Sequence, residues 1–251
     1  MNGQVRIHRL ELNNWSFELT RSLFSDLYDA FNVEDLRKFY DYSMKEVNND
    51  WIYTPKVRMC ILNPGGKKII NRPEKEFPLA RQQPLKLYLD GKSNNLSKDT
   101  PKSPATASYD AATGSVVFKM IVDAPFEFTG YIKLRVWAQT EGSDDMDVYA
   151  FLTKHDAETG KKLESVMVDV GYLAGDPEKE RQGLIAAREQ GQEWTEVYFD
   201  DGPFGCLRAS HRELDENESD QFHPVYKHQK EDLLVPGKVT PLDIAFWPYG
   251  M

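Results

Sequence analysis

The chain has 251 residues, of which 40% are hydrophobic and 12% aromatic, enough to bury the core of one large domain or two small ones. Its formal net charge of -9 at pH 7 disfavours nucleic acid and anionic membranes as partners, because phosphate binding needs a cationic surface. No apolar run reaches the ~18 residues of a membrane span, and the apolar patch in MNGQVRIHRL is too short for a signal peptide. We therefore expect a cytoplasmic protein whose partners are neutral or cationic molecules.

The first part of the chain predicts a mixture of strands and helices. A short apolar strand at Val5 to Ile7 ends at His8, and a helix is expected from Asn32 to Val47 with Asn32 as its cap. The apolar residues of this helix keep helical spacing, so one of its faces should pack on a neighbour. A strand at Val57 to Leu62 is then stopped by the turn sequence Asn63-Pro64-Gly65-Gly66.

The segment from Lys67 to Pro84 is basic and interrupted by prolines, which is typical of a connector. We place a domain boundary there, so that the domains span residues 1–83 and 84–251. The second domain shows short strands separated by turn residues, the pattern of a β-sandwich. Its expected strands are residues 85–90, 115–123, 130–139, 146–154 and 162–173, with a hairpin loop at 155–161 and a charged, helical or loop-like segment at 174–192.

Two stretches carry the most specific pattern, GYIKLRVWAQ at residues 130–139 and GCLRASHREL at residues 205–214. The first alternates as a strand with one buried face does, and the second is an extended basic segment that ends in a turn or short helix. A third block, HPVYKHQKEDLLVPGKVTPLDIAFWP, follows them at residues 223–248. In this order the blocks resemble the C-terminal domain of X-Pro dipeptidyl-peptidases and of the cocaine-esterase-like (CocE/NonD) serine hydrolases, over about Pro84 to Trp247.

The resemblance implies a mainly β fold. Residues 84–251 would form a galactose-binding-like jelly-roll β-sandwich, and residues 1–83 would be the C-terminal, α/β remnant of an α/β-hydrolase domain. It also implies a chain truncated at both ends, since relatives continue with further strands after Phe246 to Met251. We expect the missing strands to leave a sheet edge unpaired, through which the chain can self-associate.

The resemblance also assigns a candidate catalytic residue, His8. Serine hydrolases of this class hold the nucleophile in a G-x-S-x-G turn, and the nearest sequence here, Gly91 to Asn95, lacks the last glycine and lies in a polar loop. By resemblance, His8 is the general base that takes the proton of a serine hydroxyl and returns it to the leaving group. The alternative is an ordinary histidine near the terminus. Relatives place a tryptophan and an acidic-aromatic motif soon after this histidine, whereas here SFELTRSLFS separates Trp15 from Asp26-Leu27-Tyr28 and resembles an insertion.

The family would act on X-Pro peptides, esters or amides, bound where the sandwich and hydrolase domains meet. An isolated imidazole contributes little without a serine and its acid partner, so we expect the chain to be inactive alone. A small-molecule or peptide substrate would then require completion by a catalytic domain. The alternative function is a non-catalytic jelly-roll module that binds carbohydrate or a partner protein, recognisable by a shallow exposed pair of aromatic rings on one sheet face.

We expect no metal and no cofactor. Asp144, Asp145 and Asp147 could attract Ca²⁺, but the segment lacks the glycine and distal glutamate of a calcium loop, so Asp147 is better explained as a cap or an ion-pair partner. A zinc site is disfavoured as well, because neither a thiolate nor a nearby carboxylate completes a tetrahedron with the histidines His211, His223 and His228.

The remaining polar residues of this region receive structural roles. Arg208 or Arg212 should pair with a carboxylate such as Glu213 or Asp215, and the run ELDENESD should be a solvated acidic loop. The adjacency Ser210-His211 means little for catalysis, because neighbours on an extended chain point to opposite faces.

The tryptophans and cysteines are expected to serve the core. Trp137, Trp194 and Trp247 should fill the sandwich or line its face toward a hydrolase domain. Cys60 and Cys206 lie far apart in the sequence, so they imply no disulfide framework and should be small buried hydrophobes.

Overall fold

The computed structural model describes residues 5–6, 30–167, 177–192, 198–200 and 202–251. Their contacts divide the chain into two compact units, Met1–Phe77 together with Phe128–Met251, and Pro78–Glu127. The described residues are mainly β, and their strands pair antiparallel except for one pair, which confirms the expected β-rich class. The domain boundary near residue 83 stays a prediction.

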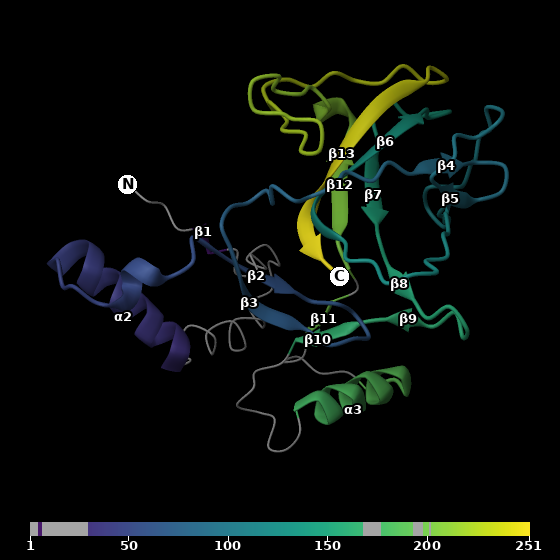
Figure 1. The fold of residues 1–251 in the computed structure, drawn as a ribbon. Helices are drawn as coiled ribbons and strands as arrows, with labels where there is room; N and C mark the ends of the chain where they lie inside the picture. The colour runs from purple at the N-terminus through teal and green to yellow at the C-terminus, as the bar shows by residue number, and fades with distance from the viewer. Residues whose placement is uncertain (1–4, 7–29, 168–176, 193–197, 201) are drawn as a thin grey trace. The chain divides into compact units, whose positions relative to one another are not determined.

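The largest sheet has four antiparallel strands in the order β6, β13, β12 and β7 (Figure 1). Their bounds are Thr129–Ala138 for β6, Thr240–Gly250 for β13, Phe204–Arg208 for β12 and Asp147–Phe151 for β7. The strands expected at residues 130–139 and 146–154 are thus confirmed, and β12 leads into the 3-10 helix η3, Ala209–His211, as the pattern at residues 205–214 predicted. β13 is paired on both sides, so β6 and β7 form the edges of this sheet.

One face of the four-stranded sheet forms the main core. Alternate side chains of β12 and β13 are buried there, and partly buried side chains of β6 and β7 pack against them. The cluster consists of Leu207, Ala209, Leu234, Leu242 and Ile244. β13 is irregular between Phe246 and Tyr249, where Pro248 has no N–H to give to a ladder.

A second, three-stranded sheet has the order β1, β2, β3. β1 (Val5–Arg6) runs parallel to β2 (Val57–Ile61), and β3 (Ile69–Glu74) runs antiparallel to β2. β2 confirms the strand expected at residues 57–62, and it is buried except for the partly buried Cys60. The expectation of a plain connector from Lys67 to Pro84 is wrong for β3. Edge strands tolerate proline because one side of their backbone needs no partner, so Pro73 does not prevent pairing.

The helix α2, Ala30–Lys45, lies between β1 and β2 in the chain and confirms the expected helix. It begins at Ala30, so the prediction that Asn32 caps it is wrong, and Asn32 lies inside the first turn. After α2 the chain forms the 3-10 helix η1, Asp50–Tyr53, whose cap is Asn49. Asn49 Oδ1 accepts a hydrogen bond from Trp51 N at 2.9 Å, and Trp51 is buried.

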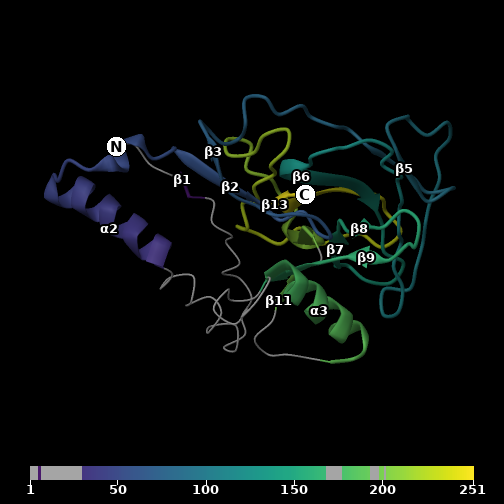
Figure 2. The same ribbon diagram turned by 60° about the horizontal axis from the view of Figure 1, so that its bottom comes forward.

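Short ladders complete the larger unit. β8 (Lys154–His155) and β9 (Lys162–Leu163) form the expected hairpin, with Gly160 in the left-handed region at φ 71°. β10 (Ser165–Met167) pairs with β11 (Tyr198–Asp200), and the charged segment between them in the chain contains a helix, α3 (Pro177–Glu189). Figure 2 shows α3 beside β11, where the Arg188 guanidinium lies 4.3 Å from the Phe199 ring centroid. None of the described helices combines the length and apolar character that crossing a membrane requires.

The smaller unit, residues 78–127, is almost devoid of core. β4 (Tyr88–Asp90) and β5 (Asn95–Ser97) form a hairpin whose turn places Asn94 at φ 57°. The strand expected at residues 115–123 is not formed, and this apolar run contributes a single bridge from Lys119 to Asn95. Leu79 is the one buried side chain of this unit, all of whose residues are described.

Candidate functional site

The expected general base, His8, lies outside the described residues, as do Trp15 and Trp194. The structure describes the strand just before His8, since β1 ends at Arg6, opposite Arg58 of β2. The assignment of His8 therefore stays a prediction. Two groups of described polar residues are considered as candidates for chemistry, the turn after β2 and the residues around the start of β7 and the end of β12.

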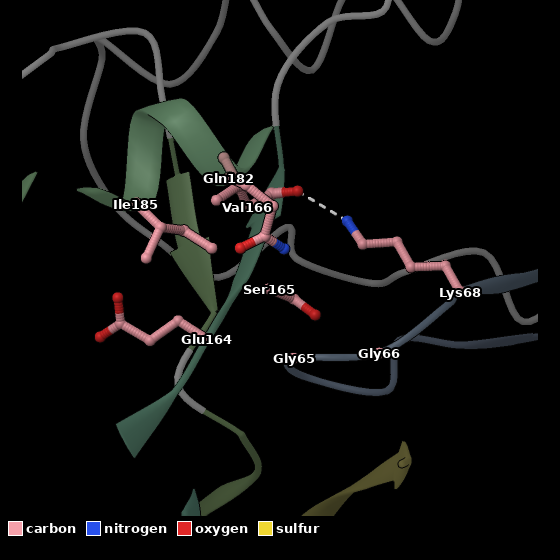
Figure 3. A pocket seen from close by; sticks show the side chains of 8 residues that line it. All are labelled: Gly65, Gly66, Lys68, Glu164, Ser165, Val166, Gln182 and Ile185. Atoms are coloured by element: carbon pink, nitrogen blue, oxygen red, sulfur yellow. Dashed lines mark hydrogen bonds between the residues drawn. The ribbon is translucent and has the colours of Figure 1, made fainter. Parts of the chain in front are cut away.

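The turn after β2 borders a small pocket (Figure 3). Asn63 and Gly65 both have positive φ, 43° and 72°, which turns the chain back into β3. A side chain at position 65 would meet Leu163 Cδ1 at 2.9 Å, so glycine is required there. The pocket is lined by Gly65, Gly66, Lys68, Glu164, Ser165, Val166, Gln182 and Ile185.

The polar groups at this pocket hold the structure together. Lys68 Nζ donates to the Val166 carbonyl oxygen at 2.6 Å, a contact that Figure 3 shows at the edge of the pocket. The buried Ser165 donates its hydroxyl proton to the carbonyl oxygen of Leu62 at 3.1 Å. A nucleophilic serine would need that proton directed to a base, so Ser165 is placed as a structural link and not as a nucleophile.

At the end of β12, Ser210 is held by Asp145. The Asp145 carboxylate accepts the Ser210 backbone N–H at 2.9 Å and the Ser210 hydroxyl at 2.8 Å, and a third bond comes from Met146 N at 2.9 Å. Burial alone would raise the pKa of Asp145, but the hydrogen bonds from Ser210 and Met146 outweigh it and lower the pKa below the usual value. The His211 ring instead lies 5.5 Å from the His228 ring, between centroids, which agrees with a structural role for the Ser210-His211 pair.

The ion pairs of this segment differ from those expected. Arg208 forms a bidentate ion pair with Asp147, with N–O distances of 2.9 and 3.0 Å, and Arg212 forms an ion pair with Asp232. Asp147 is therefore an ion-pair partner, as predicted. The expected partners of the arginines are wrong, because Glu213 binds Lys227 at 2.8 Å and Asp215 accepts a hydrogen bond from the backbone N–H two residues on, at 3.0 Å. Arg208 lies directly opposite Asp147 in the sheet register, which decides its partner.

The described part of the chain contains no group of three His, Cys, Asp or Glu side chains placed to hold a metal ion. Two of the three candidate aspartates are used by Ser210 and Arg208. All three candidate histidines have ring partners. His223 stacks on Tyr131 at 4.4 Å between centroids, and His228 lies near both His211 and Tyr226, at 5.5 and 5.7 Å.

The tryptophans and cysteines only partly follow the prediction. Trp137 and Trp247 are exposed, so they do not fill the core, and the buried tryptophan is Trp51, which sequence reasoning missed. The signal for Trp51 was the asparagine cap two residues before it. The prediction that Cys206 is buried is wrong, because strand alternation places it on the exposed face of β12.

A second residue missed by sequence reasoning is Tyr226. Its hydroxyl donates to the carbonyl oxygen of Asp243 at 2.7 Å and accepts from the backbone N–H of Ala245 at 2.9 Å. β12 and β13 share a single registered pair, Gly205 with Phe246, so the phenol serves backbone groups of β13 that no β12 partner reaches. Tyr226 thereby anchors the loop after η3 to the sheet.

Comparison with known proteins gives the family of this arrangement. A family model described as the X-Pro dipeptidyl-peptidase C-terminal non-catalytic domain matches residues 49–251, which include all four strands of the main sheet. Two crystal structures of a CocE/NonD family hydrolase from Staphylococcus aureus are similar to the chain, each with a TM-score of 0.72 and 28% sequence identity. The similarity covers 90% of this chain and 36% of that hydrolase, so the chain spans about a third of its length.

A search of curated proteins gives no match. The family model alone covers most of the chain, and the similarity to a hydrolase of the CocE/NonD family is independent of it. The chain belongs to the family of X-Pro dipeptidyl-peptidase C-terminal non-catalytic domains.

Proposed function

We propose that the chain is the C-terminal part of a serine hydrolase that cleaves X-Pro peptides, esters or amides. The observation that carries this proposal is the match of residues 49–251 to a domain described as non-catalytic. A non-catalytic domain implies a catalytic one, and the similar CocE/NonD hydrolase is a longer chain of which this one matches 36%. Of residues 1–83, those that precede the match, residues 1–48, would then be the adjoining piece of an α/β-hydrolase domain.

The arrangement of β1, α2 and β2 supports that assignment. Parallel strands need a crossover connection, usually a helix, and α2 lies between the parallel strands β1 and β2 in the chain. None of the described side chains of α2 is buried, and Leu36, Tyr40 and Met44 are exposed along it. An exposed apolar helix face of this kind fits a segment that packs on further parts of a hydrolase domain.

In this proposal His8 is the general base. A serine hydroxyl is a poor nucleophile until a positioned base removes its proton, and the base later protonates the leaving group. The sequence holds no G-x-S-x-G motif, so the serine and its acid would come from a catalytic domain. We further propose that the β-rich part is a galactose-binding-like jelly roll, which the antiparallel four-stranded sheet with one buried face supports.

The simplest test uses the chain alone with an activated ester and an X-Pro anilide. We expect no turnover above buffer and no labelling by a serine-directed fluorophosphonate, because the chain provides no elbow serine. Robust turnover that disappears in His8→Ala would show that the chain holds its own nucleophile and would contradict the proposal.

A sharper test is a chimaera in which this chain replaces the matching 36% of the Staphylococcus aureus hydrolase. We expect ester hydrolysis by the folded chimaera, and a loss of kcat of at least ~100-fold in His8→Ala, since a general base contributes about that much. His155→Ala is the matched control, because His155 is exposed in the β8–β9 hairpin and should leave kcat unchanged. A folded chimaera whose activity survives His8→Ala would refute the role of His8.

A further inference from the structure

β7 is an edge strand whose outer side is open. Leu152 N donates to Pro203 O and Ala209 N donates to Met146 O, so the even-numbered residues of β7 bond to β12. In an antiparallel pair the alternate residues point their backbone groups the other way, here Asp147, Tyr149 and Phe151. No strand within the described ranges pairs with that outer side.

The exposed face of this edge is apolar. Tyr149 is 63% exposed and Phe151 67%, and Phe204 on the neighbouring strand is 39% exposed. The rings of Phe151 and Phe204 are stacked, with centroids 6.1 Å apart and an interplanar angle of 28°. The only formal charge among the five residues of β7, on Asp147, is balanced by Arg208. An open apolar edge without a guarding charge is a template for another strand.

The opposite edge of the same sheet does not share this character. β6 carries Arg135 and the partly exposed Lys133 on the face of the sheet away from the core. Arg135 is balanced by Asp243 of β13, as Asp147 is by Arg208, so the charge that distinguishes this edge is Lys133, and lysine is a usual protection of an edge strand. Trp137 of β6 is as exposed as Phe151, at 67%, but it lies next to Arg135 in the alternation of that face. The two edges therefore differ in charge more than in aromatic exposure.

We propose that β7 is a dimerisation edge at which two copies of this chain pair antiparallel around Ala150. A two-fold axis there places Tyr149 of each copy opposite Phe151 of the other, so that the outward backbone groups of both strands satisfy one another. Aromatic residues opposed across strands stabilise such pairs. The small Ala150 side chains meet at the axis, where a non-hydrogen-bonded pair brings the strands closest. The two sheets become one continuous sheet.

The occupant is a second copy because the strand is complementary to itself. The two-fold arrangement matches aromatic to aromatic and brings no unbalanced charge opposite the rings. Pairing through one five-residue strand buries less area than the ~1,600 Å² of a standard interface. The dimer should therefore form in a concentration-dependent equilibrium. Each copy carries a net charge of -9, and salt near ~0.15 M screens this repulsion.

Sedimentation velocity of the whole chain over a range of concentrations tests the proposal. We expect a monomer–dimer equilibrium for the wild type, and a dissociation constant raised on the order of tenfold or more in Tyr149→Lys. Phe151→Lys should act in the same direction. Trp137→Lys is the matched control, an equally exposed aromatic on the other edge, and should dimerise like the wild type. A monomeric wild type, equal dimerisation by Tyr149→Lys, or an equal loss in Trp137→Lys would overturn the proposal.

A cross-link tests the register. With Cys60 and Cys206 replaced by serine, Ala150→Cys should form an intermolecular disulfide under mild oxidation, because the two-fold axis brings the two Cβ atoms together. Leu152→Cys should not, since Leu152 would lie opposite Val148 of the second copy. A bond at position 152 without one at position 150 would contradict the pairing. If the wild type stays monomeric and binds soluble oligosaccharide at the same face, the dimer proposal is wrong and this face is a carbohydrate-binding surface.

Discussion

At the scale of single residues, Tyr226 shows how one side chain can replace strand pairing. Its hydroxyl serves both a donor and an acceptor of β13 where β12 has diverged from it. Tyr226→Phe should therefore lower the free energy of unfolding by roughly 1–3 kcal/mol, the cost of leaving partly buried backbone groups without partners. Urea denaturation measures this loss. Tyr149→Phe is the control and should change stability little, because that hydroxyl is exposed.

The effect of Tyr226→Phe on stability should also depend on pH in the alkaline range. Burial raises the pKa of the Tyr226 phenol, so the folded state holds the proton more tightly than the unfolded state. The stability that this tighter proton binding gives is fully present below the ordinary tyrosine pKa of ~10. It is lost as the pH rises through the pKa of Tyr226 in the folded state. The stability difference between wild type and Tyr226→Phe should therefore narrow above pH ~10. A difference that is constant up to the alkaline unfolding limit would contradict it.

Gly205 is required by the close approach of β12 to β13. A Cβ at this position would press on the carbonyl oxygen of Ala245 and lie 3.1 Å from Ile244 Cγ2, at the single registered pair between the two strands. Gly205→Ala should destabilise the protein by ~1–3 kcal/mol, as overpacking of a core does. Gly142→Ala should be close to neutral, since nothing lies within 4 Å of its Cβ. Equal thermal midpoints for both variants would refute the steric explanation.

At the scale of elements, α2 is held to β2 by a partly buried ion pair. Asp35 and Arg58 have side chains 12% and 9% exposed, and the two oxygens of the carboxylate accept hydrogen bonds from the guanidinium at 2.9 and 2.6 Å. Phe39 adds an edge-to-face contact with Trp51, at 5.4 Å between centroids. These two contacts connect α2 to β2 and to η1.

Asp35→Asn should loosen α2 selectively. Losing one partner leaves the Arg58 charge without its carboxylate, which costs roughly 1–3 kcal/mol at a shielded site. We expect faster hydrogen exchange across residues 30–45 and unchanged exchange in β13. Glu34→Gln is the control, because Glu34 pairs with Arg37 on the exposed side of the same helix, where an ion pair contributes little. Equal exchange in the two variants would show that Asp35 does not hold the helix.

The elements also show which parts of the fold could be predicted from sequence. β2, β6 and β7 were expected because their apolar residues alternate or run together between turn residues, a local pattern. β3 was missed because Pro73 and the lysines before it resemble a connector, and only pairing with β2 makes it a strand. The apolar run at 115–123 shows the reverse case, a strand-like pattern that gains no more than one bridge.

The candidate site depended even more on what sequence cannot supply. The partner of Arg208 follows from the register of β7 against β12, which sets Asp147 opposite it. Nothing in the local pattern distinguishes that aspartate from Glu213 or Asp215. The role of Tyr226 likewise arises from a divergence of two strands that are distant in sequence. Family blocks located this region correctly, while its contacts required three-dimensional structure.

At the scale of the whole molecule, β13 joins the two parts of the larger unit. Its residue Gly250 accepts hydrogen bonds from Leu62 N at 2.9 Å and Asn63 N at 3.3 Å, and its backbone lies so close to Ile61 that a Cβ would reach Ile61 Cδ1 at 2.7 Å. The strand that completes the main sheet therefore also touches the end of β2. The stability of this unit should be shared between both sheets.

The smaller unit lacks such support, and its stability should differ accordingly. Residues 78–127 bury one apolar side chain, Leu79, whereas the core cluster of the larger unit alone buries five. Local opening is easiest where few apolar contacts protect the backbone. We expect the amides of residues 98–127 to exchange with solvent well before those of β6 and β13, and limited proteolysis to cut there first. Protection of residues 98–127 as strong as that of β13 would show that contacts outside this unit's own core stabilise it.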